Sequence, residues 1–394
     1  MAIKKNVLFS QDFFPIYGGA HLWLYEVYKR WGSEVSAIVQ DYQFDNRLYS
    51  MQRKFDTKEH GFLEIIRKDI KAPDINILSR SFHKTIKKNI GFIDEVCCNE
   101  QTTINVLRAF PEGISGCVYK ILHPKSCKLI TYAHGEEILI ALTSKQLLWS
   151  CKLVYFLSDL IIANSYSTKK LVQSIAPKAQ IEVVYPGVDY KRFLNFSYDS
   201  SCIRAKWSVN DNEILLFSMA RIETRKNHIS VIKAVKMCID NGINIKYLIA
   251  SDGDEKDRLV QMVKEQQFEN FVIFIGYLSE EEKISTLFSC DIHIMPSIQN
   301  DSTTEGFGIV FLEAAAAGVP SISGNVGGQP ESVINGKTGF VVDGNDIPEI
   351  AKIISTLCAD EKLRKKMGNC GRKWAKENDW DNVANKIKRI SNKI

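Results

Sequence analysis

The chain has 394 residues, of which 45% are hydrophobic and 25% are charged, and its formal net charge is +5. This length is too great for one ordinary hydrophobic core and suits two α/β domains of a soluble globular protein. Ten scattered cysteines without a CxxC pair exclude a disulfide framework and a zinc site, and they indicate a reduced, cytoplasmic protein.

The positive charge is concentrated in residues 47–90, which hold eleven Lys/Arg against five Asp/Glu. Such a stretch is usually a solvated face, but it would also attract anionic lipid headgroups or an acidic acceptor. Peripheral contact with the inner face of a membrane is therefore one expectation. Nucleic acid is not an expected partner, because the stretch lacks interleaved aromatic residues and any recognisable binding module.

No secretory signal or membrane span is expected. The N-terminal MAIKKNVLFSQDFF has only a short apolar stretch. The most apolar segment, LLWSCKLVYFLSDLIIA, is interrupted by Lys152 and Asp159 and is not expected to cross a bilayer.

In chain order, KNVLFSQDFFP predicts a strand and a loop, and YGGAHLWLYEVYKRW predicts a helix. Gly18-Gly19 lies at this junction, where a backbone can approach a phosphate closely, although turns also use such pairs. EVSAIVQD and IDEVCC predict further strands. KLITYAHGEE predicts a strand that brings His134 to its C-terminal end, where ligands bind in open α/β sheets. A structural, hydrogen-bonded histidine remains the alternative.

DLIIANSYSTKKLV and IEVVYPGVD complete the first alternation of strands and helices, and the polar residues 190–210 suggest a linker between domains. The second alternation contains the apolar strands EILLFSMA, IKYLIASDGD, VIFIGYL, DIHIMPS and PSISG. Strands that alternate with helices imply parallel sheets with right-handed crossovers, so we expect two such sheets in tandem with a cleft between them.

Residues 305–331, EGFGIVFLEAAAAGVPSISGNVGGQPE, contain the strongest indication of a binding site. Glu305 and Glu313 stand eight residues apart, and Glu313 is the one charged residue of an otherwise apolar helix that ends at Gly318. A carboxylate there needs hydrogen-bond donors, which sugar hydroxyls supply, while glycine-rich loops at helix N-termini suit phosphates. The pattern suggests a nucleotide-sugar site. It also fits a packed α/β corner whose glutamates face solvent.

Two cations, Arg221 and Lys226, follow the strand EILLFSMA and could together neutralise a diphosphate. Their neighbours Glu223 and Arg225 are expected to be ordinary surface charges.

Other motifs carry no site. The sequence Asp252-Gly253-Asp254 resembles a metal-binding motif, but we expect a turn because Asp-Gly is a common turn pair. No phosphate loop, GxGxxG, GxSxG, HExxH or Cys/His ligand cluster is present, so neither a metal site nor a cofactor is expected.

The segment EGFGIVFLEAAAAGVPSISGNVGGQPESVINGKTGFVVD resembles that of the retaining glycosyltransferases of family 4, within glycosyltransferase group 1. Supporting segments occur earlier in the chain, in the same order as in that family: FPIYGGAHLWLYEV, TYAHGEE, IIANSYSTKKLV, VVYPGVD, MARIETRKNH, VIFIGYLSEEE and MPSI. The resemblance implies the GT-B fold, in which two Rossmann-like domains face each other across a cleft. It places an acceptor-binding domain at 1–190, joined by the C-terminal helix 378–394, and a donor-binding domain at 191–377.

The resemblance also implies roles for individual residues. Glu305 would bond hydroxyls of the donor sugar, and Glu313 would bind the ribose. Arg221 and Lys226 would hold the diphosphate, and His134 would lie near the reacting centre. The donor would also contact four residues through their backbone: Gly19, Gly306, Phe307 and Gly308. Ser251 and Asp254 depart from the usual Gly-Asp-Gly-Pro turn, IDEVCCNE lacks a histidine common there, and Glu136 and Glu137 receive no role.

The implied reaction is hexosyl transfer from a GDP- or UDP-sugar to a hydroxyl of a glycan or lipid-linked acceptor, with retention of configuration. The family likeness suggests a short-lived oxocarbenium ion, with the departing phosphate accepting the proton of the acceptor. The setting implied is synthesis of cell-envelope polysaccharide or glycolipid. Two alternatives remain: a nucleotide-sugar epimerase or hydrolase on the same fold, and a non-catalytic binding partner. An intact set of the four charged residues argues against the second.

Overall fold

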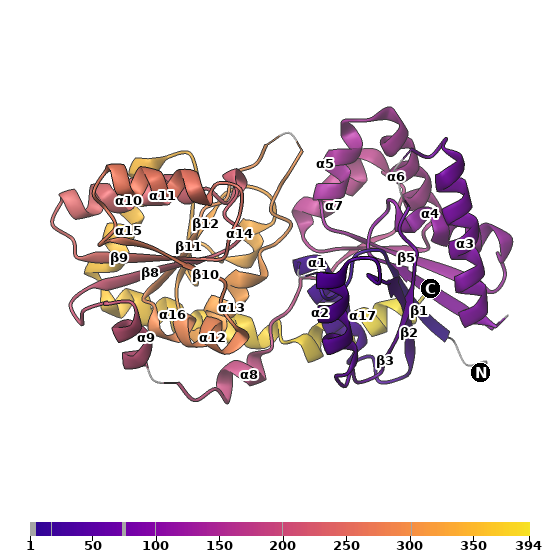
Figure 1. Ribbon diagram of the computed structural model, residues 1–394, viewed down its shortest axis with the longest axis horizontal. Coiled ribbons are helices and arrows are strands. Elements are labelled where there is room, and N and C mark those ends of the chain that lie inside the picture. The colour runs from indigo at the N-terminus through magenta and orange to yellow at the C-terminus, as the bar shows by residue number, and fades with distance from the viewer. Residues whose placement is uncertain (1–4, 17, 73–75, 99, 199, 301) are drawn as a thin grey trace. The chain divides into compact units, whose positions relative to one another are not determined.

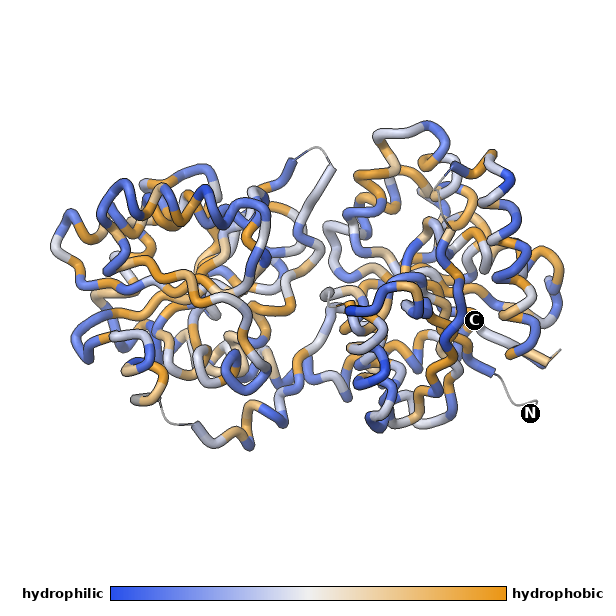
Figure 2. The backbone as a smooth tube through the Cα atoms, viewed as in Figure 1, coloured by the Kyte–Doolittle hydropathy of each residue, from blue (hydrophilic) through white to orange (hydrophobic). Residues whose placement is uncertain are grey.

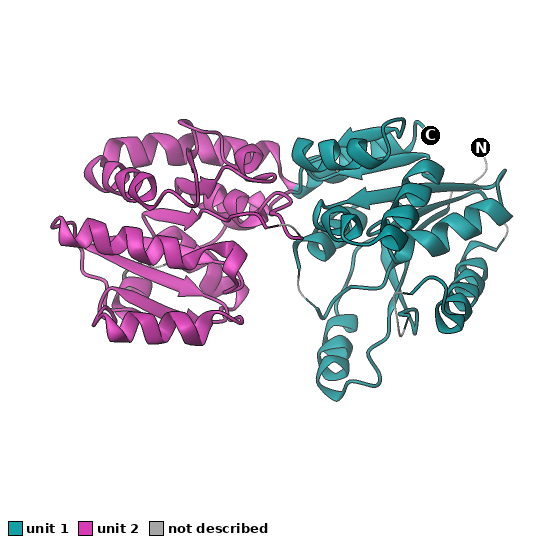
Figure 3. Ribbon diagram, turned by 90° about the horizontal axis from the view of Figure 1, so that it is seen from above, with its two compact units in different colours: residues 1–186, 380–394 teal, residues 187–379 magenta. Residues whose placement is uncertain are grey.

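The computed structural model describes residues 5–16, 18–72, 76–98, 100–198, 200–300 and 302–394. The contacts divide the chain into two units, which Figure 3 distinguishes by colour. Unit 1 consists of residues 1–186 and 380–394, and unit 2 consists of residues 187–379. The first four residues, which belong to the segment expected not to be a secretory signal, lie outside the described residues.

Unit 1 is built on a parallel sheet (Figure 1). Within the described residues the strand order is β3-β2-β1-β4-β5-β6-β7. The strands are β1 (Lys5–Ser10), β2 (Val35–Gln40), β3 (Leu63–Lys68), β4 (Thr102–Val106), β5 (Cys127–Ala133), β6 (Leu160–Ala163) and β7 (Ile181–Val183). Both faces of such a sheet are covered by helices, which is why every residue of β2, β4 and β6 is buried.

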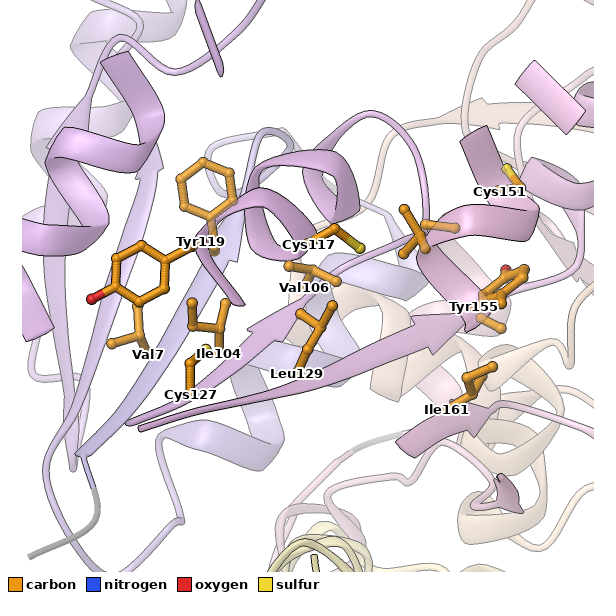
Figure 4. Packing of buried hydrophobic residues seen from close by; sticks show 14 of the residues in the cluster. Val7, Ile104, Val106, Cys117, Tyr119, Cys127, Leu129, Cys151, Tyr155 and Ile161 are labelled. Carbon is orange, nitrogen blue, oxygen red and sulfur yellow. The ribbon is translucent and has the colours of Figure 1, made fainter. Parts of the chain in front are cut away.

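Helices connect these strands, and the last helix of the chain also belongs to unit 1. They are α1 (Gly19–Tyr28), α2 (Asn46–Asp56), α3 (Arg80–Cys97), α4 (Glu112–Leu122), α5 (Glu136–Leu142), α6 (Lys145–Leu157), α7 (Tyr166–Ile175) and α17 (Trp380–Ser391). Figure 4 shows how side chains of α4 and α6, namely Cys117, Tyr119, Cys151 and Tyr155, lie in the core with side chains of β4, β5 and β6, namely Val106, Leu129 and Ile161.

The predicted strand IDEVCC is wrong, because these residues form the end of helix α3. Its buried positions recur every three or four residues, and the Ser79 hydroxyl accepts a hydrogen bond from the Phe82 amide at 3.1 Å to cap the helix. A short segment with only four apolar residues, here separated by Asp94 and Glu95, does not distinguish a strand from the buried face of a helix. The strand in this part of the chain is instead β4, which pairs with β1 and whose short sequence TTINV gave no strong indication.

Residues 190–210 are not an irregular linker. They contain the helices α8 (Tyr190–Leu194) and α9 (Ser200–Lys206). The Asp189 side chain caps α8, and the rings of Phe196 and Tyr198 stack on Phe288. The segment is therefore packed as part of unit 2.

Unit 2 is built on a second parallel sheet, with the order β10-β9-β8-β11-β12-β13 in the part of the chain that the structure describes. Its strands are β8 (Ile214–Met219), β9 (Ile245–Ala250), β10 (Val272–Gly276), β11 (Ile292–Met295), β12 (Ser321–Gly324) and β13 (Gly339–Val342). Its remaining helical elements are η1 (Thr224–Lys226), α10 (His228–Asp240), α11 (Lys256–Glu265), α12 (Glu280–Ser289), α13 (Ile309–Ala317), α14 (Gln329–Ser332), α15 (Ile347–Ala359) and α16 (Glu361–Glu377).

Hydrophobic segments concentrate inside each unit, while the surface helices alternate between polar and apolar stretches (Figure 2). None of the helices within the described ranges is both long and apolar enough to cross a membrane.

Each sheet has a point at which the strand order reverses, and this point determines where side chains from different loops can meet. In unit 1, β1 lies between β2 and β4. In unit 2, β8 lies between β9 and β11. Loops after two such neighbouring strands leave in opposite directions, so a crevice opens at their carboxyl ends and is the usual ligand position in open α/β sheets.

Candidate functional site

In unit 2, the loop after β8 and the loop after β11 are joined at the reversal point. The carbonyl of Arg225 accepts a hydrogen bond from the amide of Ile298 at 2.9 Å. Asn227 has a left-handed backbone, with φ of 62°, and its side-chain amide donates to the carbonyls of Pro296 and Gly344. These bonds fix the turn η1, and with it the positions of Arg225 and Lys226.

Glu305 is the anionic centre of this site. Its Oε2 accepts hydrogen bonds from Lys226 Nζ and from Arg225 Nη1, the latter at 3.0 Å. The side chains of Lys226, Arg225 and Glu305 are 12%, 15% and 13% exposed. Burial alone would raise the pKa of Glu305, but the charges of Lys226 and Arg225 outweigh it and hold the pKa below its ordinary value. The carboxylate is therefore ionised at neutral pH.

Arg221 does not join this cluster. Its side chain is 71% exposed, and its nearest acid is Glu223 at 3.8 Å. The expectation that Arg225 is an ordinary surface charge is wrong, since its guanidinium bridges Glu305 and Glu223. The structure therefore brings together Lys226 and Glu305 from the predicted set and adds Arg225, while Arg221 stays at the surface.

Two glycine-containing loops pack backbone against backbone beside Glu305. The Gly328 amide donates to the Glu305 carbonyl at 2.8 Å, and a Cβ on Gly328 would lie 2.0 Å from the Gly306 carbonyl oxygen. Gly308, with φ of 88°, precedes the first turn of α13. The ring of Phe307 is buried, so what this residue can offer a ligand is its backbone. Glycine at these positions allows the two loops to approach each other.

A buried side chain holds the same two loops together. Gln329 Oε1 accepts hydrogen bonds from the amides of Ser297 and Gly324, and its Nε2 donates to the carbonyl of Ser297. One fully buried amide thus ties the end of β11 to the end of β12.

Glu313 lies on α13 and is buried, as its position on an apolar helix predicts. Its partner is Lys283 of α12, with Nζ 2.7 Å from Oε1, and Lys283 also contacts Glu280 at 2.9 Å. Burial alone would lower the pKa of Lys283, but the charges of Glu313 and Glu280 outweigh it and raise the pKa. Both predicted glutamates are thus paired with cations, and neither fits the alternative of a solvent-facing corner.

In unit 1, His134 follows β5 at the carboxyl edge of the sheet, as expected. Its Nε2–H donates to the carbonyl of Leu107 at 2.8 Å, which leaves Nδ1 as an acceptor. Burial lowers the pKa of His134 to about 4, so the imidazole is neutral at physiological pH. The rings of Trp23 and His134 make an edge-to-face contact, with their centroids 5.7 Å apart. A neutral imidazole of fixed tautomer can accept a hydrogen bond but carries no positive charge.

Glu137, which had no assigned role, holds the backbone of His134. Its Oε1 accepts from the His134 amide at 2.9 Å and from the Tyr155 hydroxyl at 3.3 Å. Burial raises the pKa of Glu137, although these and other hydrogen bonds partly oppose the shift. Glu136 is exposed at the start of α5.

A second charged cluster lies at the reversal point of the unit 1 sheet. Arg108, after β4, pairs with Asp12, after β1, and its Nε lies 3.5 Å from Oε2 of Glu112. Glu112 is completely buried, and its Oε1 accepts from the Gln11 amide at 3.1 Å. Gly19, expected to approach phosphate, is exposed and is the first residue of α1. These residues place charged and polar groups at the carboxyl edge of the unit 1 sheet, where α/β sheets bind ligands.

The Asp252-Gly253-Asp254 segment is a turn. The Ile222 amide donates to the Asp252 carbonyl at 2.9 Å, and a Cβ on Gly253 would lie 2.3 Å from the Ile222 carbonyl oxygen. Asp252 faces Lys256 at 3.5 Å. Over the described part of the chain, no group of three or more His, Cys, Asp or Glu side chains is arranged to hold a metal ion.

The sequence missed three charged groups: Arg225, Lys283 and the Arg108 cluster. Arg225 directly precedes a predicted cation, and Arg108 directly follows a short strand, so their positions at strand ends were the available signals. Lys283 lies 30 residues from Glu313 in the chain, on another helix, and nothing in the sequence pairs them.

Comparison with known families agrees with this geometry. Residues 199–374 match the model of the family described as glycosyl transferases group 1. The matched segment contains the Arg225–Lys226–Glu305 cluster and the Lys283–Glu313 pair.

Individual relatives are also glycosyltransferases. The chain is 31% identical over 217 residues to a GDP-mannose-dependent alpha-(1-6)-phosphatidylinositol monomannoside mannosyltransferase of Mycolicibacterium smegmatis, covering 55% of this chain and 56% of that protein. It is 27% identical over 270 residues to the N-acetyl-alpha-D-glucosaminyl L-malate synthase of Bacillus anthracis, covering 68% of each. The match therefore spans little more than half the length of the mycobacterial enzyme.

Solved structures share the fold over nearly the whole chain. HepE of Anabaena, in complex with UDP and glucose, superposes with a TM-score of 0.77 at 20% identity, covering 99% of this chain and all of that one. WaaG, a glycosyltransferase involved in lipopolysaccharide biosynthesis, gives 0.71 at 14% identity, covering 98% and 99%. The predicted fold class, α/β with two Rossmann-like units of the GT-B type, is confirmed. The part of the chain that matches the glycosyl transferases group 1 family, residues 199–374, is the part that carries the Arg225–Lys226–Glu305 cluster.

Proposed function

We propose that this chain is a hexosyltransferase that moves a sugar from a nucleoside diphosphate sugar to an acceptor hydroxyl with retention of configuration. The observation that carries the proposal is the buried Arg225–Lys226–Glu305 cluster at the reversal point of the unit 2 sheet. It combines a carboxylate for sugar hydroxyls with cations for a diphosphate. The GDP-mannose dependence of the mycobacterial relative and the complex of HepE with UDP support a donor of this class.

In this mechanism the protein stabilises charge on the departing diphosphate and orients the reacting groups. Lys226 would turn from Glu305 towards the phosphate, while Arg225 keeps the carboxylate ionised and in place. Arg221, whose side chain is exposed, would turn inwards and supply the second charge. The backbone of Gly306, Phe307 and Gly308 would face the sugar.

Glu313 would receive the ribose hydroxyls, with Lys283 holding its carboxylate. The acceptor would lie in unit 1, where His134 Nδ1 can accept a hydrogen bond and Gly19 opens α1. With two cations for the diphosphate, the mechanism needs no metal, and chelators are expected to leave the rate unchanged.

The biological setting is also part of the proposal. The names of the relatives include phosphatidylinositol mannoside enzymes and a capsular polysaccharide glycosyltransferase of Staphylococcus aureus. They support a glycan or lipid-linked acceptor in envelope or polysaccharide synthesis. We place the protein in the cytoplasm, at the inner face of the membrane, where such acceptors are exposed.

The test is a donor screen followed by two variants. Thermal melts with UDP-, GDP- and ADP-sugars identify the donor, and product analysis then separates transfer from release of free sugar. Lys226→Ala and Glu305→Gln should each lower kcat by about 10²–10³-fold, the size of effect seen when one charge-stabilising donor is removed. Glutamine is preferable to alanine at 305, because it keeps the size of the side chain and an oxygen that can accept hydrogen bonds from Lys226 and Arg225.

Arg258→Ala serves as the control variant, since this side chain is exposed and pairs with Glu255, the residue before α11. Transfer at the wild-type rate in either site variant would refute the assignment. Free sugar as the main product in the presence of every acceptor would favour a hydrolase instead.

A further inference from the structure

Helix α6 has an exposed apolar face that the site does not use. Trp149 and Phe156 are 74% and 78% exposed, and Leu153 between them is also exposed. The spacing of four and then three residues places the three side chains on one face. The opposite face carries Cys151, Val154 and Tyr155 into the core, as Figure 4 shows for Cys151 and Tyr155. We call Trp149, Leu153 and Phe156 the α6 stripe.

The charges that helix α6 carries are all positive. Lys145 and Lys152 are exposed on it, and its sequence, KQLLWSCKLVYFL, contains no acidic residue. At the N-terminal end of the helix, Gln146 Nε2 donates to Asn76 Oδ1 at 2.9 Å. Asn76 lies four residues before α3, whose first turns expose further basic side chains, namely Arg80, Lys84 and Lys87.

We infer that the α6 stripe inserts into the surface of an anionic lipid bilayer. A helix with tryptophan, leucine and phenylalanine on one face and flanking lysines is typical of segments that lie in the membrane interface. Lysine stems lie along apolar surface while their ammonium groups reach the headgroups. Because α6 carries lysines and no acidic residue, its charge complements the phosphate of anionic lipid headgroups. This favours a lipid surface as the partner over a neutral protein surface.

This inference deepens the proposed function, because a lipid-linked acceptor would be reached from such a surface. It relocates the expected membrane contact from charge alone in residues 47–90 to apolar side chains on α6. Binding can be measured without donor or acceptor, so the two proposals can fail separately.

The test is co-sedimentation of the full chain with vesicles of phosphatidylcholine alone, or of phosphatidylcholine and phosphatidylglycerol in equal parts. The wild-type chain should bind the mixed vesicles and bind the neutral ones weakly. The double variant Trp149→Ser/Phe156→Ser should bind at least tenfold more weakly. Because both side chains are already exposed, its thermal melt should match that of the wild type.

The matched control is Phe44→Ser/Tyr277→Ser, which removes two other aromatic side chains that are 87% and 77% exposed. It should bind like the wild type. In addition, the emission of Trp149, obtained as the difference between wild type and Trp149→Phe, should shift to shorter wavelength with the mixed vesicles.

Equal vesicle binding by the stripe variant and the wild type would overturn the inference. The inference would also be overturned if light scattering showed a dimer for the wild type and a monomer for the stripe variant while neither protein bound vesicles. A second copy of the chain would then cover the stripe. Stripe-dependent vesicle binding without turnover of any nucleotide sugar would support the inference and refute only the proposed function.

Discussion

At the scale of single residues, Glu137 couples stability to pH. Burial raises its pKa, so the ionised form is less favourable in the folded chain than in the unfolded chain. The stability that comes from this carboxyl group is therefore fully present below its unfolded pKa and is lost as the pH rises through its folded pKa.

We predict that Glu137→Gln removes this dependence. Glutamine keeps an oxygen that can accept from the His134 amide and the Tyr155 hydroxyl, and it has no charge to desolvate. The difference in melting temperature between the variant and the wild type should increase from about pH 4 to about pH 8. This range begins near the ordinary pKa of glutamate and extends past neutral pH. Melts across this range measure it.

Glu136→Gln is the control for this prediction. The two glutamates share the first turn of α5, but Glu136 is exposed. Its variant removes an exposed carboxylate from the same helical turn, so its melts across the same pH range show what the loss of a charge there does without the loss of a buried group. A Glu137→Gln difference that stays constant or falls with pH would contradict the account.

The two glutamates of the site were predictable because the sequence isolates them. Glu313 stands alone on an apolar helix, and Glu305 precedes a Gly-Phe-Gly turn. Arg225 lies among four charged residues within six positions, and only the turn η1, with the left-handed Asn227 after it, directs it inwards. Sequence spacing specifies which charges are unusual, whereas the pairing of charges depends on the path of the backbone.

At the scale of elements, α13 is held against α16 by glycines. A Cβ on Gly368 would lie 1.9 Å from the Gly318 carbonyl oxygen, and a Cβ on Gly371 would lie 3.3 Å from Ala315. Arg372 donates to the Ala317 carbonyl at 2.9 Å and covers the end of α13. The helix that carries Glu313 therefore depends on close contact with α16.

We predict that Gly368→Ala separates these helices and lowers stability by about 1–3 kcal/mol, the usual cost of overpacking a well-packed contact. Donor affinity should also fall, because Glu313 would move with α13. Chemical denaturation and donor titration measure the two effects.

Gly91→Ala is the matched control, since Gly91 also lies in a helix but a Cβ there meets no atom within 4 Å. It should stabilise the chain by about 0.5–1 kcal/mol, because alanine is the better helix former. Stability of Gly368→Ala equal to that of Gly91→Ala would show that the contact can relax.

Most strands were predictable because both faces of a parallel sheet are buried and the strands are rich in apolar residues, as in LIIA of β6. The sequence failed where burial does not follow that rule. β4 carries Thr102, Thr103 and Asn105 in buried positions, and Asn105 Nδ2 donates to the Val7 carbonyl of β1 at 3.4 Å. The end of α3, in contrast, has apolar residues on both sides of Asp94 and Glu95 and resembles a strand in the sequence.

At the scale of the whole molecule, the chain leaves unit 1 and later returns to it. Helix α17 packs on α1, with Val383, Ala384 and Ile387 buried. Polar bonds add to this contact: Arg30 Nε lies 2.9 Å from Asp381, and Lys388 Nζ donates to the Trp31 carbonyl at 2.7 Å. The assignment of acceptor to unit 1 and donor to unit 2 stays a prediction.

Because α17 completes the covering of α1, a chain that ends at Asp379 should lose stability in unit 1 alone. Calorimetry of the truncated chain should show two transitions. The transition of unit 1 should move to a lower temperature, whereas that of residues 187–379 should keep its melting temperature. Added donor should still raise the melting temperature of the second transition. In the full chain, Ile387→Ala should reproduce the effect at about 2–5 kcal/mol, and the exposed Asn385→Ala should not. If both transitions fell together in the truncated chain, the two units would unfold as one. Donor-dependent stabilisation would then report on the whole molecule, and the two sheets could not be tested separately.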